Sequence, residues 1–210
     1  MQFEFWQNNT MIKVIVFGLW ETLGSKHFSA SQALREHFGI QASPDFLEKY
    51  ERSMQLEVWG DIRRMATSFL EAFTISPTQQ NISTVVDIIQ KGIDQAELFT
   101  GMEELLKKLQ QHYQLAILSN TNNFEATVID TWNIDKYFSN KFYSWRLKSL
   151  KPSRKNFHEV CKAFAVEPNH CLYVDNEERS TDAAKKYGFN VIVFKSFPEL
   201  IRQLNVMNIF

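Results

Sequence analysis

The first clear pattern along the chain is a continuous apolar run rich in β-branched residues, residues 13–19, "KVIVFGL". A run of this length is typical of a strand that is buried on both faces. Helical spacing of apolar positions then recurs in four successive segments before the next strand pattern. These segments are residues 29–38, 44–58, 61–73 and 78–91. Pro44 and Pro77 lie near two of the predicted helix starts, where a missing N–H costs little.

After Thr100 and Gly101 the pattern changes to strands alternating with helices of 10–14 residues. Strands are predicted at 114–118, 141–144, 171–174 and 190–194, and helices at 102–112, 124–132, 154–164, 179–187 and 198–204. This alternation predicts an α/β fold with a Rossmann-like parallel sheet and right-handed crossovers. The expected division is a core of residues 11–24 and 95–210, an inserted all-helical cap of residues 25–94, and an N-terminal extension of residues 1–10.

An open parallel sheet binds ligands beyond the carboxyl ends of its strands. The residues that follow the predicted strands are 18–23, 119–122 and 175–178, and the loop before the helix at 154 carries Lys151. We therefore expect these four loops to meet at one crevice, with the helical block above it as a lid.

Composition narrows the classes of partner. Apolar residues make up 44% of the chain, charged residues 22%, and the net charge is −1, so bulk charge gives no reason to expect nucleic acid or a membrane surface. No segment approaches the roughly 18 uninterrupted apolar residues that a membrane helix needs. Cys161 and Cys171 lie within apolar patterns without metal-ligand spacing, which predicts buried, reduced thiols and a cytoplasmic protein.

The four loops resemble, in order, the four motifs of the haloacid dehalogenase-like hydrolases, a superfamily of aspartate-nucleophile phosphatases and dehalogenases. The first motif of the family reads Phe-Asp-x-x-Gly-Thr-Leu, and Phe17, Thr22 and Leu23 match it. The second is an apolar strand that ends in Ser or Thr, as in "LAILSN" with Ser119 and Asn120.

The third and fourth motifs complete the resemblance. Lys151 and Pro152 precede a helix that contains Phe157, as the family's Lys-Pro does. The fourth motif is an apolar strand that ends in Asp175, followed by Ala-Ala and Gly, in "LYVDNEERSTDAAKKYGF". The resemblance spans residues 12–205, with the insertion where the family has its helical cap.

The resemblance implies a catalytic site with two degenerate positions. In the family an aspartate of the first motif attacks phosphorus, or the carbon that bears a halogen. Gly18 occupies that position here, and Trp20 occupies the position of the general acid/base aspartate. Removal of a covalent nucleophile can lower turnover by a factor on the order of 10⁶, judged from a protease triad. Glu21 follows on the turn, and we expect it to be solvated rather than to replace the nucleophile.

A magnesium site is implied but weakened. In the family, Asp175 corresponds to a Mg²⁺ ligand that acts with the nucleophile's carboxylate and a backbone carbonyl, here that of Trp20. Glycine at position 18 removes one carboxylate, and Ser180 falls where a second acidic or amide residue is common. Magnesium is usually held by one or two carboxylates with phosphate and water, so we expect its affinity to fall.

The phosphate-binding half of the motif set is present. Ser119 can donate its hydroxyl to an anion, Lys151 supplies a fixed positive charge, and the backbone N–H groups of Asn120 and Thr121 are expected to face the crevice. The alternatives are that Ser119 caps a helix and that Lys151 is a surface lysine.

Two hypotheses follow, and a third possibility concerns the origin of Gly18. One is a catalytically silent member, a pseudoenzyme that keeps a crevice for a small anionic or phosphorylated ligand and offers a protein partner the cap surface near Trp59, Phe69 and Leu70. The other is an active Mg²⁺-dependent phosphatase that uses a substitute carboxylate or a water held by Asp175. If Gly18 is an introduced residue, the natural protein is an ordinary active enzyme.

Overall fold

A five-stranded sheet, parallel throughout, forms the centre of the molecule in the computed structural model, which describes residues 11–43 and 45–210. The strand order is β5-β4-β1-β6-β7. The strands are β1 (Val14–Phe17), β4 (Gln114–Ser119), β5 (Asn140–Tyr143), β6 (Cys171–Asp175) and β7 (Asn190–Val193). The predicted parallel α/β sheet is confirmed. Residues 1–10 and Pro44, which the sequence analysis discussed, lie outside the described residues.

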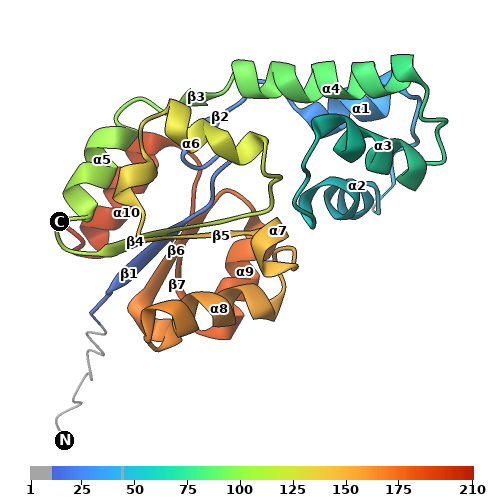
Figure 1. The fold of residues 1–210 in the computed structure, drawn as a ribbon. Coiled ribbons are helices and arrows are strands. Elements are labelled where there is room, and N and C mark those ends of the chain that lie inside the picture. The colour runs from blue at the N-terminus through green and yellow to red at the C-terminus, as the bar shows by residue number, and fades with distance from the viewer. Residues whose placement is uncertain (1–10, 44) are drawn as a thin grey trace, which may run out of the picture.

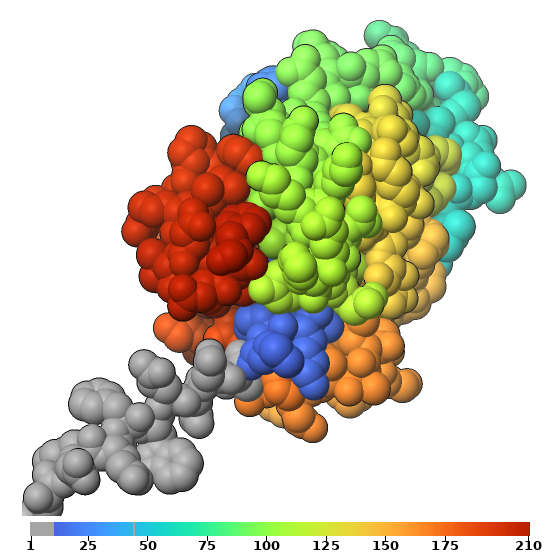
Figure 2. Space-filling model, turned by 90° about the vertical axis from the view of Figure 1, so that its left-hand side faces the viewer, coloured from blue at the N-terminus to red at the C-terminus, as the bar shows by residue number. Residues whose placement is uncertain are grey.

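Helices cover both faces of this sheet because alternate side chains of each strand point to opposite sides. Ile15 and Phe17 of β1 belong to one apolar core, and Val14 and Val16 belong to the other. The first core is covered by α5 (Met102–Leu109), α6 (Val128–Thr131) and α10 (Phe197–Val206), and the second by α8 (Arg154–Phe164) and α9 (Glu178–Tyr187). Figure 2 shows α5 and α10 side by side on the first face.

A separate apolar core holds the inserted helices together. These are α1 (Ala30–His37), α2 (Phe46–Gln55), α3 (Ile62–Ala72) and α4 (Gln79–Asp94), which lie together in Figure 1. Leu34, Met54, Met65 and Ile89 are fully buried among them. Asp61 caps α3 by accepting a hydrogen bond from the N–H of Arg63. The helices therefore form the expected inserted unit, while its status as a separate domain with bounds 25–94 stays a prediction.

The expectation that Phe69 and Leu70 lie at a surface of this helical unit is wrong. Phe69 and Leu70 are completely buried in its core, and Trp59 is half-buried. The indole of Trp59 donates to the carbonyl of Met54 at 2.8 Å. Phe69 and Leu70 face inward because the apolar pattern of α3 serves packing against the neighbouring helices, so neither contributes to a docking surface. A protein partner on this unit stays a prediction.

The carboxyl-terminal end of α2 is attached to the loops of the sheet. Ser144 Oγ donates to the carbonyl of Gln55 at 2.6 Å, and Lys148 Nζ donates to the carbonyl of Leu56 at 2.9 Å. Asn123 makes two hydrogen bonds with the backbone of Trp59, at 2.9 and 3.0 Å. Residues far apart in the sequence thus satisfy carbonyls at and beyond the helix end that would otherwise lack partners.

Several boundaries differ from the sequence prediction. The ladder of β1 ends at Phe17, the predicted helix at 124–132 is a 3-10 turn (Glu125–Thr127) followed by the short α6, and Ser144 begins the short helix α7 (Ser144–Leu147). Two further 3-10 turns are Asp135–Tyr137 and Pro168–His170. Cys161 and Cys171 are buried, as predicted. Within residues 11–43 and 45–210, no helix has the length and apolar character needed to cross a membrane.

A two-stranded antiparallel ribbon, which the sequence analysis missed, joins the helical unit to the sheet. It pairs β2 (Gly24–Ser25) with β3 (Glu97–Leu98). Strands of two residues carry no hydrophobic period, so no pattern could have indicated them. A Cβ added at Gly24 would lie 2.4 Å from the carbonyl oxygen of Glu97 and 2.6 Å from Cη2 of Trp132. Only glycine fits this crossing without movement of the backbone.

Gly24→Ala is therefore expected to lower the free energy of unfolding by about 1–3 kcal/mol, the usual cost of overpacking a tight site. Urea unfolding of both proteins measures the difference. Gly60→Ala is the matched control, because a Cβ there meets no atom within 4 Å. Equal losses in the two variants would contradict a steric requirement at Gly24.

Candidate functional site

The loops at the carboxyl ends of the strands line one crevice of about 210 Å³. Leu19, Trp20 and Glu21 come from the loop after β1, and Ser119 and Asn120 from the end of β4 and the loop that follows it. The remaining lining residues are Lys151, Asp175, Asn176, Glu177 and, from α2, Glu51. The topology brings these loops together because the ends of parallel strands share one edge of the sheet.

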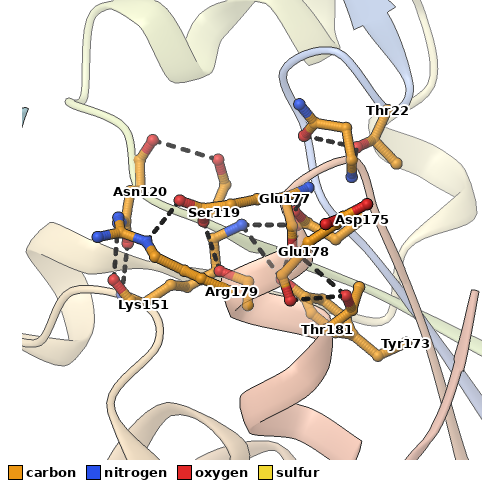
Figure 3. A network of polar contacts seen from close by, with 12 residues as sticks. Thr22, Ser119, Asn120, Lys151, Tyr173, Asp175, Glu177, Glu178, Arg179 and Thr181 are labelled. Atoms are coloured by element: carbon orange, nitrogen blue, oxygen red, sulfur yellow. Dashed lines mark hydrogen bonds and ion pairs between the residues drawn. The ribbon is translucent and has the colours of Figure 1, made fainter. Parts of the chain in front are cut away.

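A compact group of polar side chains lies at the floor of this crevice (Figure 3). Lys151 Nζ and the hydroxyl of Tyr173 both donate to Oδ2 of Asp175, each at 2.6 Å. Lys151 Nζ also lies 3.1 Å from the Tyr173 oxygen, and the N–H of Glu177 donates to Oδ1 of Asp175 at 2.9 Å. The side chains of Lys151 and Asp175 are 8% and 1% exposed. Both oxygens of the Asp175 carboxylate are therefore engaged, and the ion pair is shielded from water.

The carboxylate of Asp175 occupies the space beside Gly18. A Cβ at position 18 would lie 2.3 Å from Oδ2 of Asp175, and 3.0 Å from both its Cγ and the Oγ1 of Thr22. Gly18 directly follows the last residue of β1, and its N–H donates to the carbonyl of Val174 at 2.8 Å. Glycine at this position is thus the residue that allows Asp175 to turn toward Lys151.

Tyr173 is a site residue that the sequence analysis did not single out. Burial, and then the charge of Asp175, raise the pKa of Tyr173 well above its ordinary value. The hydroxyl therefore stays protonated and acts as a donor to Asp175. Tyr173 and Asp175 are two positions apart on β6, so the period of a strand places them on the same face and could have indicated the pair.

Trp20 and Thr22 hold structural positions in the first loop. The indole N–H of Trp20 donates to Oγ1 of Thr121 at 3.3 Å, and its ring meets Trp132 edge to face with centroids 5.9 Å apart. An indole cannot serve as a general acid or base, because its N–H is too weakly acidic to give up a proton and its nitrogen has no free lone pair to accept one. Thr22 is completely buried and accepts a hydrogen bond from the N–H of Asn176 at 3.2 Å. It thus ties the loop after β1 to the loop after β6.

Asn120 fixes the backbone around Lys151. Its Oδ1 accepts from the N–H of Lys151 at 2.7 Å, and its Nδ2 donates to the carbonyl of Lys151 at 3.3 Å and to Oε1 of Glu51 at 3.1 Å. Ser119 is 3% exposed and lies at the crevice wall, with a long contact of 3.4 Å to the carbonyl of Asn120. Ser119 does not cap a helix, and the burial of Lys151 excludes the surface-lysine alternative.

The expectation that the backbone N–H of Thr121 faces the crevice is wrong. The N–H of Thr121 donates to Oγ of Ser144 at 3.2 Å, in a buried hydrogen bond, and therefore does not face the crevice. The same serine hydroxyl donates to the carbonyl of Gln55 at the end of α2. The N–H of Thr121 therefore helps to hold the serine that attaches α2 to the loops.

Carboxylates dominate the charge of the crevice. Glu21, Glu51, Asp175 and Glu177 line it together with one lysine. Arg179, at the rim, contacts Glu177 at 2.6 Å and Glu51 at 3.7 Å. Burial raises the pKa of Glu51, while the hydrogen bond from Asn120 and the charge of Arg179 oppose that rise. The sequence analysis singled out neither residue. Glu51 lies outside the four motifs, and Arg179 lies in the segment of the fourth motif but has no assigned role there.

The donor set does not fit Mg²⁺ as it stands. Both oxygens of Asp175 are bonded to Lys151, Tyr173 and the N–H of Glu177, and Ser180 donates its hydroxyl to Glu177. No group of three or more His, Cys, Asp or Glu side chains within the described part of the chain is arranged to hold a metal ion. Magnesium needs near-octahedral oxygen ligands, so the Asp175 side chain would first have to leave Lys151.

The family model described as "Haloacid dehalogenase-like hydrolase" matches residues 28–194, most of the chain. The chain belongs to the haloacid dehalogenase-like hydrolase family. The matched region includes Ser119, Lys151 and Asp175 and begins after the Gly18 loop. A search of curated proteins found no match.

Solved structures of haloacid dehalogenase-like hydrolases share this fold at low sequence identity. A predicted HAD-like family hydrolase from Porphyromonas gingivalis has a TM-score of 0.65 and 19% identity, covering 92% of this chain and 98% of its own. A HAD family enzyme from Bacteroides thetaiotaomicron, in complex with magnesium and inorganic phosphate, has a TM-score of 0.65 and 18% identity, over 91% and 100%.

The L-2-haloacid dehalogenase from Xanthobacter autotrophicus, with chloropropionic acid covalently bound, has a TM-score of 0.60 and 19% identity, over 95% and 85%. At these identities the likeness shows the fold alone. Among these similar structures, one holds inorganic phosphate and another a covalently bound chloropropionic acid.

Proposed function

We propose that this member of the haloacid dehalogenase-like family is catalytically impaired and keeps the crevice without the chemistry of an attacking aspartate. The position of the Asp175 carboxylate, which fills the space beside Gly18, carries the proposal. A glycine cannot attack a substrate, and Trp20 cannot transfer a proton. Glu21 is exposed and accepts a hydrogen bond from Ser25 at 2.8 Å, so it is oriented toward β2 at the rim.

Weak ligand and metal binding is part of the same proposal. The four carboxylates that line the crevice outnumber its one lysine and repel a free anion, and Lys151 is already paired with Asp175. A small phosphorylated ligand at Ser119, Asn120 and Lys151 therefore has to compete with Asp175 for the ammonium group. Mg²⁺ would have to compete with Lys151 for Asp175. Mg²⁺ is therefore expected to bind less tightly than in a site with its nucleophile present, and the phosphorylated ligand is expected to bind weakly because Lys151 is already paired.

Hydrolysis of an aryl phosphate with Mg²⁺ tests the proposal. The protein is expected to show no turnover above that of Asp175→Asn prepared in the same way, since loss of a nucleophile costs a factor on the order of 10⁶. Circular dichroism of both proteins checks that they are folded.

A second candidate function, a phosphatase that uses Asp175 as a substitute carboxylate, is favoured by one observation. The Asp175 carboxylate lies where a side chain at position 18 would be, next to Lys151. Mg²⁺-dependent turnover by the protein as it stands, abolished in folded Asp175→Asn, would establish this candidate and overturn the first.

A further inference from the structure

Three adjoining hollows run along α5, beginning where the described chain begins. The first, of about 530 Å³, is lined by the first described residues and by residues 110–114, and the second, of about 440 Å³, shares three of these residues with it. The third, of about 550 Å³, lies between α5 and α10 and shares Lys108 and Phe210 with the second. In Figure 2, α5 and α10 lie side by side above the blue start of the described chain. Because neighbouring hollows share walls, they form one continuous groove, called here the α5 groove.

The lining of the α5 groove changes from polar to apolar along its length. The polar lining residues of the first hollow are Lys13, Gln110, Gln111, His112 and Gln114. The apolar lining residues of the third hollow are Leu105, Phe197, Ile201 and Phe210. Met11 in the first hollow and Phe210 in the second and third are 71% and 54% exposed. Exposed apolar side chains that gather beside polar ones indicate a surface that receives a partner.

The wall that the end of the chain contributes to the groove is held in place by hydrogen bonds. The hydroxyl of Tyr113 donates to the carbonyl of Ile209 at 3.1 Å. The N–H of Ile209 donates to the carbonyl of Leu204 in α10 at 3.0 Å. Phe210 is therefore attached next to α5 before any partner binds, which lowers the cost of ordering the groove.

Residues 1–10, "MQFEFWQNNT", show the same order of polar and apolar character as the groove. Counted back from Met11, residues 7–10 are polar, and residues 3–6 contain three aromatic side chains. The eight residues of α5 span about 12 Å, whereas ten extended residues can span roughly 33 Å. The segment is long enough for its polar part to pass the first hollow and for its aromatic part to reach the space between α5 and α10.

The charge of the segment also matches the groove. Glu4 is the only charged side chain among residues 1–10. Lys108 lines both the second and the third hollow, is exposed, and makes no ion pair with the residues the structure describes. Glu104 lies one helical turn further from the start of the described chain, in the third hollow alone. An acidic side chain that enters from Met11 therefore meets Lys108 first.

We propose that residues 1–10 dock in the α5 groove of the same molecule, with the aromatic side chains between α5 and α10 and Glu4 beside Lys108. The aromatic side chains would cover apolar surface that the described residues leave open to water, which is favourable in proportion to the area covered. The groove starts at the amino ends of β1 and β4, whereas the Gly18 crevice lies at the carboxyl ends of the strands. The proposal therefore does not depend on the chemistry of the crevice.

Limited proteolysis of the full chain with chymotrypsin tests the proposal, because this protease cleaves after aromatic residues. Cleavage after Phe5 and Trp6 requires the undocked segment, so its rate follows the undocked population. The synthetic peptide of residues 1–10 gives the rate without a groove. Cleavage in the protein, followed by mass spectrometry, is expected to be about tenfold slower than in the peptide, which corresponds to roughly 90% docked molecules.

Variants of the groove identify where the segment lies. Lys108→Glu is expected to speed cleavage by about two- to fivefold, the effect of one exposed ion pair, and Phe210→Ser is expected to speed it by removing apolar contact. Lys107→Glu is the matched control, because Lys107 is exposed but does not line the groove. Both lysine replacements place a glutamate four residues after an existing one, so they have similar effects on α5 itself. Glu4→Lys combined with Lys108→Glu is expected to restore slow cleavage.

Repeating the cleavage at several protein concentrations separates docking within one molecule from exchange between two. The rate constant is expected to be independent of concentration. Slower cleavage at higher concentration would mean that the segment occupies the groove of a second copy, and would overturn the proposal. Cleavage as fast as in the peptide, or rates unchanged by both Lys108→Glu and Phe210→Ser, would overturn it as well. Circular dichroism checks that each variant is folded.

Discussion

Asp175→Ala is expected to lower the free energy of unfolding by about 3–5 kcal/mol, the usual loss when one partner of a buried ion pair is removed. The reason is the ammonium group of Lys151, whose side chain is only 8% exposed and which lies 2.6 Å from the Asp175 carboxylate. Without Asp175 this charge would stay in the interior with only the Tyr173 oxygen as a partner. Urea unfolding at neutral pH, followed by circular dichroism, measures the loss.

The matched control for this prediction removes both charges. Lys151→Met/Asp175→Leu is expected to recover most of the stability, because replacing a whole buried pair by apolar residues is often neutral. Adding Tyr173→Phe removes the hydroxyl that would otherwise lose its acceptor. A loss below about 1 kcal/mol in Asp175→Ala would contradict the buried pair, since that is the size expected of an exposed one.

Gly18→Asp is expected to destabilise the protein rather than to restore turnover. The added Cβ would lie 2.3 Å from Oδ2 of Asp175, and overpacking of this kind costs about 1–3 kcal/mol. The second carboxylate adds repulsion of about 4 kcal/mol, taking roughly 4 Å and an effective dielectric constant near 20. The introduced side chain could act as a nucleophile only after Asp175 had moved away.

Gly18→Ala separates the two causes, because it adds the Cβ without the charge. The difference in stability between the Asp and Ala variants is expected to shrink as the pH falls from 8 to 5. Two adjacent carboxylates raise their shared folded-state pKa above the unfolded value, so the folded state takes up a proton first and gains stability at lower pH. Equal stabilities of the two variants at pH 8, or clear phosphatase turnover by Gly18→Asp alone, would contradict this account.

The fold could be predicted where long patterns carried the information. The apolar run at β1 and the alternation after Gly101 predicted the parallel sheet because burial on both faces requires such runs. The β2–β3 ribbon could not be predicted, because its strands have two residues each and show no hydrophobic period. Phe69 and Leu70 were misplaced on the surface because a helix pattern shows which residues are apolar, but not how many neighbouring helices they meet.

The candidate site could be predicted only as far as the ends of strands. Loop positions indicated that Ser119, Lys151 and Asp175 approach one another, and the structure places them around one crevice. The direction of the Asp175 side chain could not be predicted, because it depends on the empty space at Gly18 and on Lys151, far away in sequence. Glu51 reaches the crevice through the packing of α2, and Arg179 of α9 contacts it there. No local motif encodes this contact between residues far apart in the sequence.

The attachment of α2 to the loops has a consequence for how fast and how tightly ligands bind. Separating its end from the sheet would break four hydrogen bonds, made by Ser144, Lys148 and Asn123. At about 0.5–1.5 kcal/mol each, they disfavour separation by about 2–6 kcal/mol. Molecules in which the end of α2 is separated from the loops of the sheet then make up at most a few per cent of the population. Any ligand too large to pass between α2 and the loops has to wait for this minor population, and its apparent affinity falls by the same fraction.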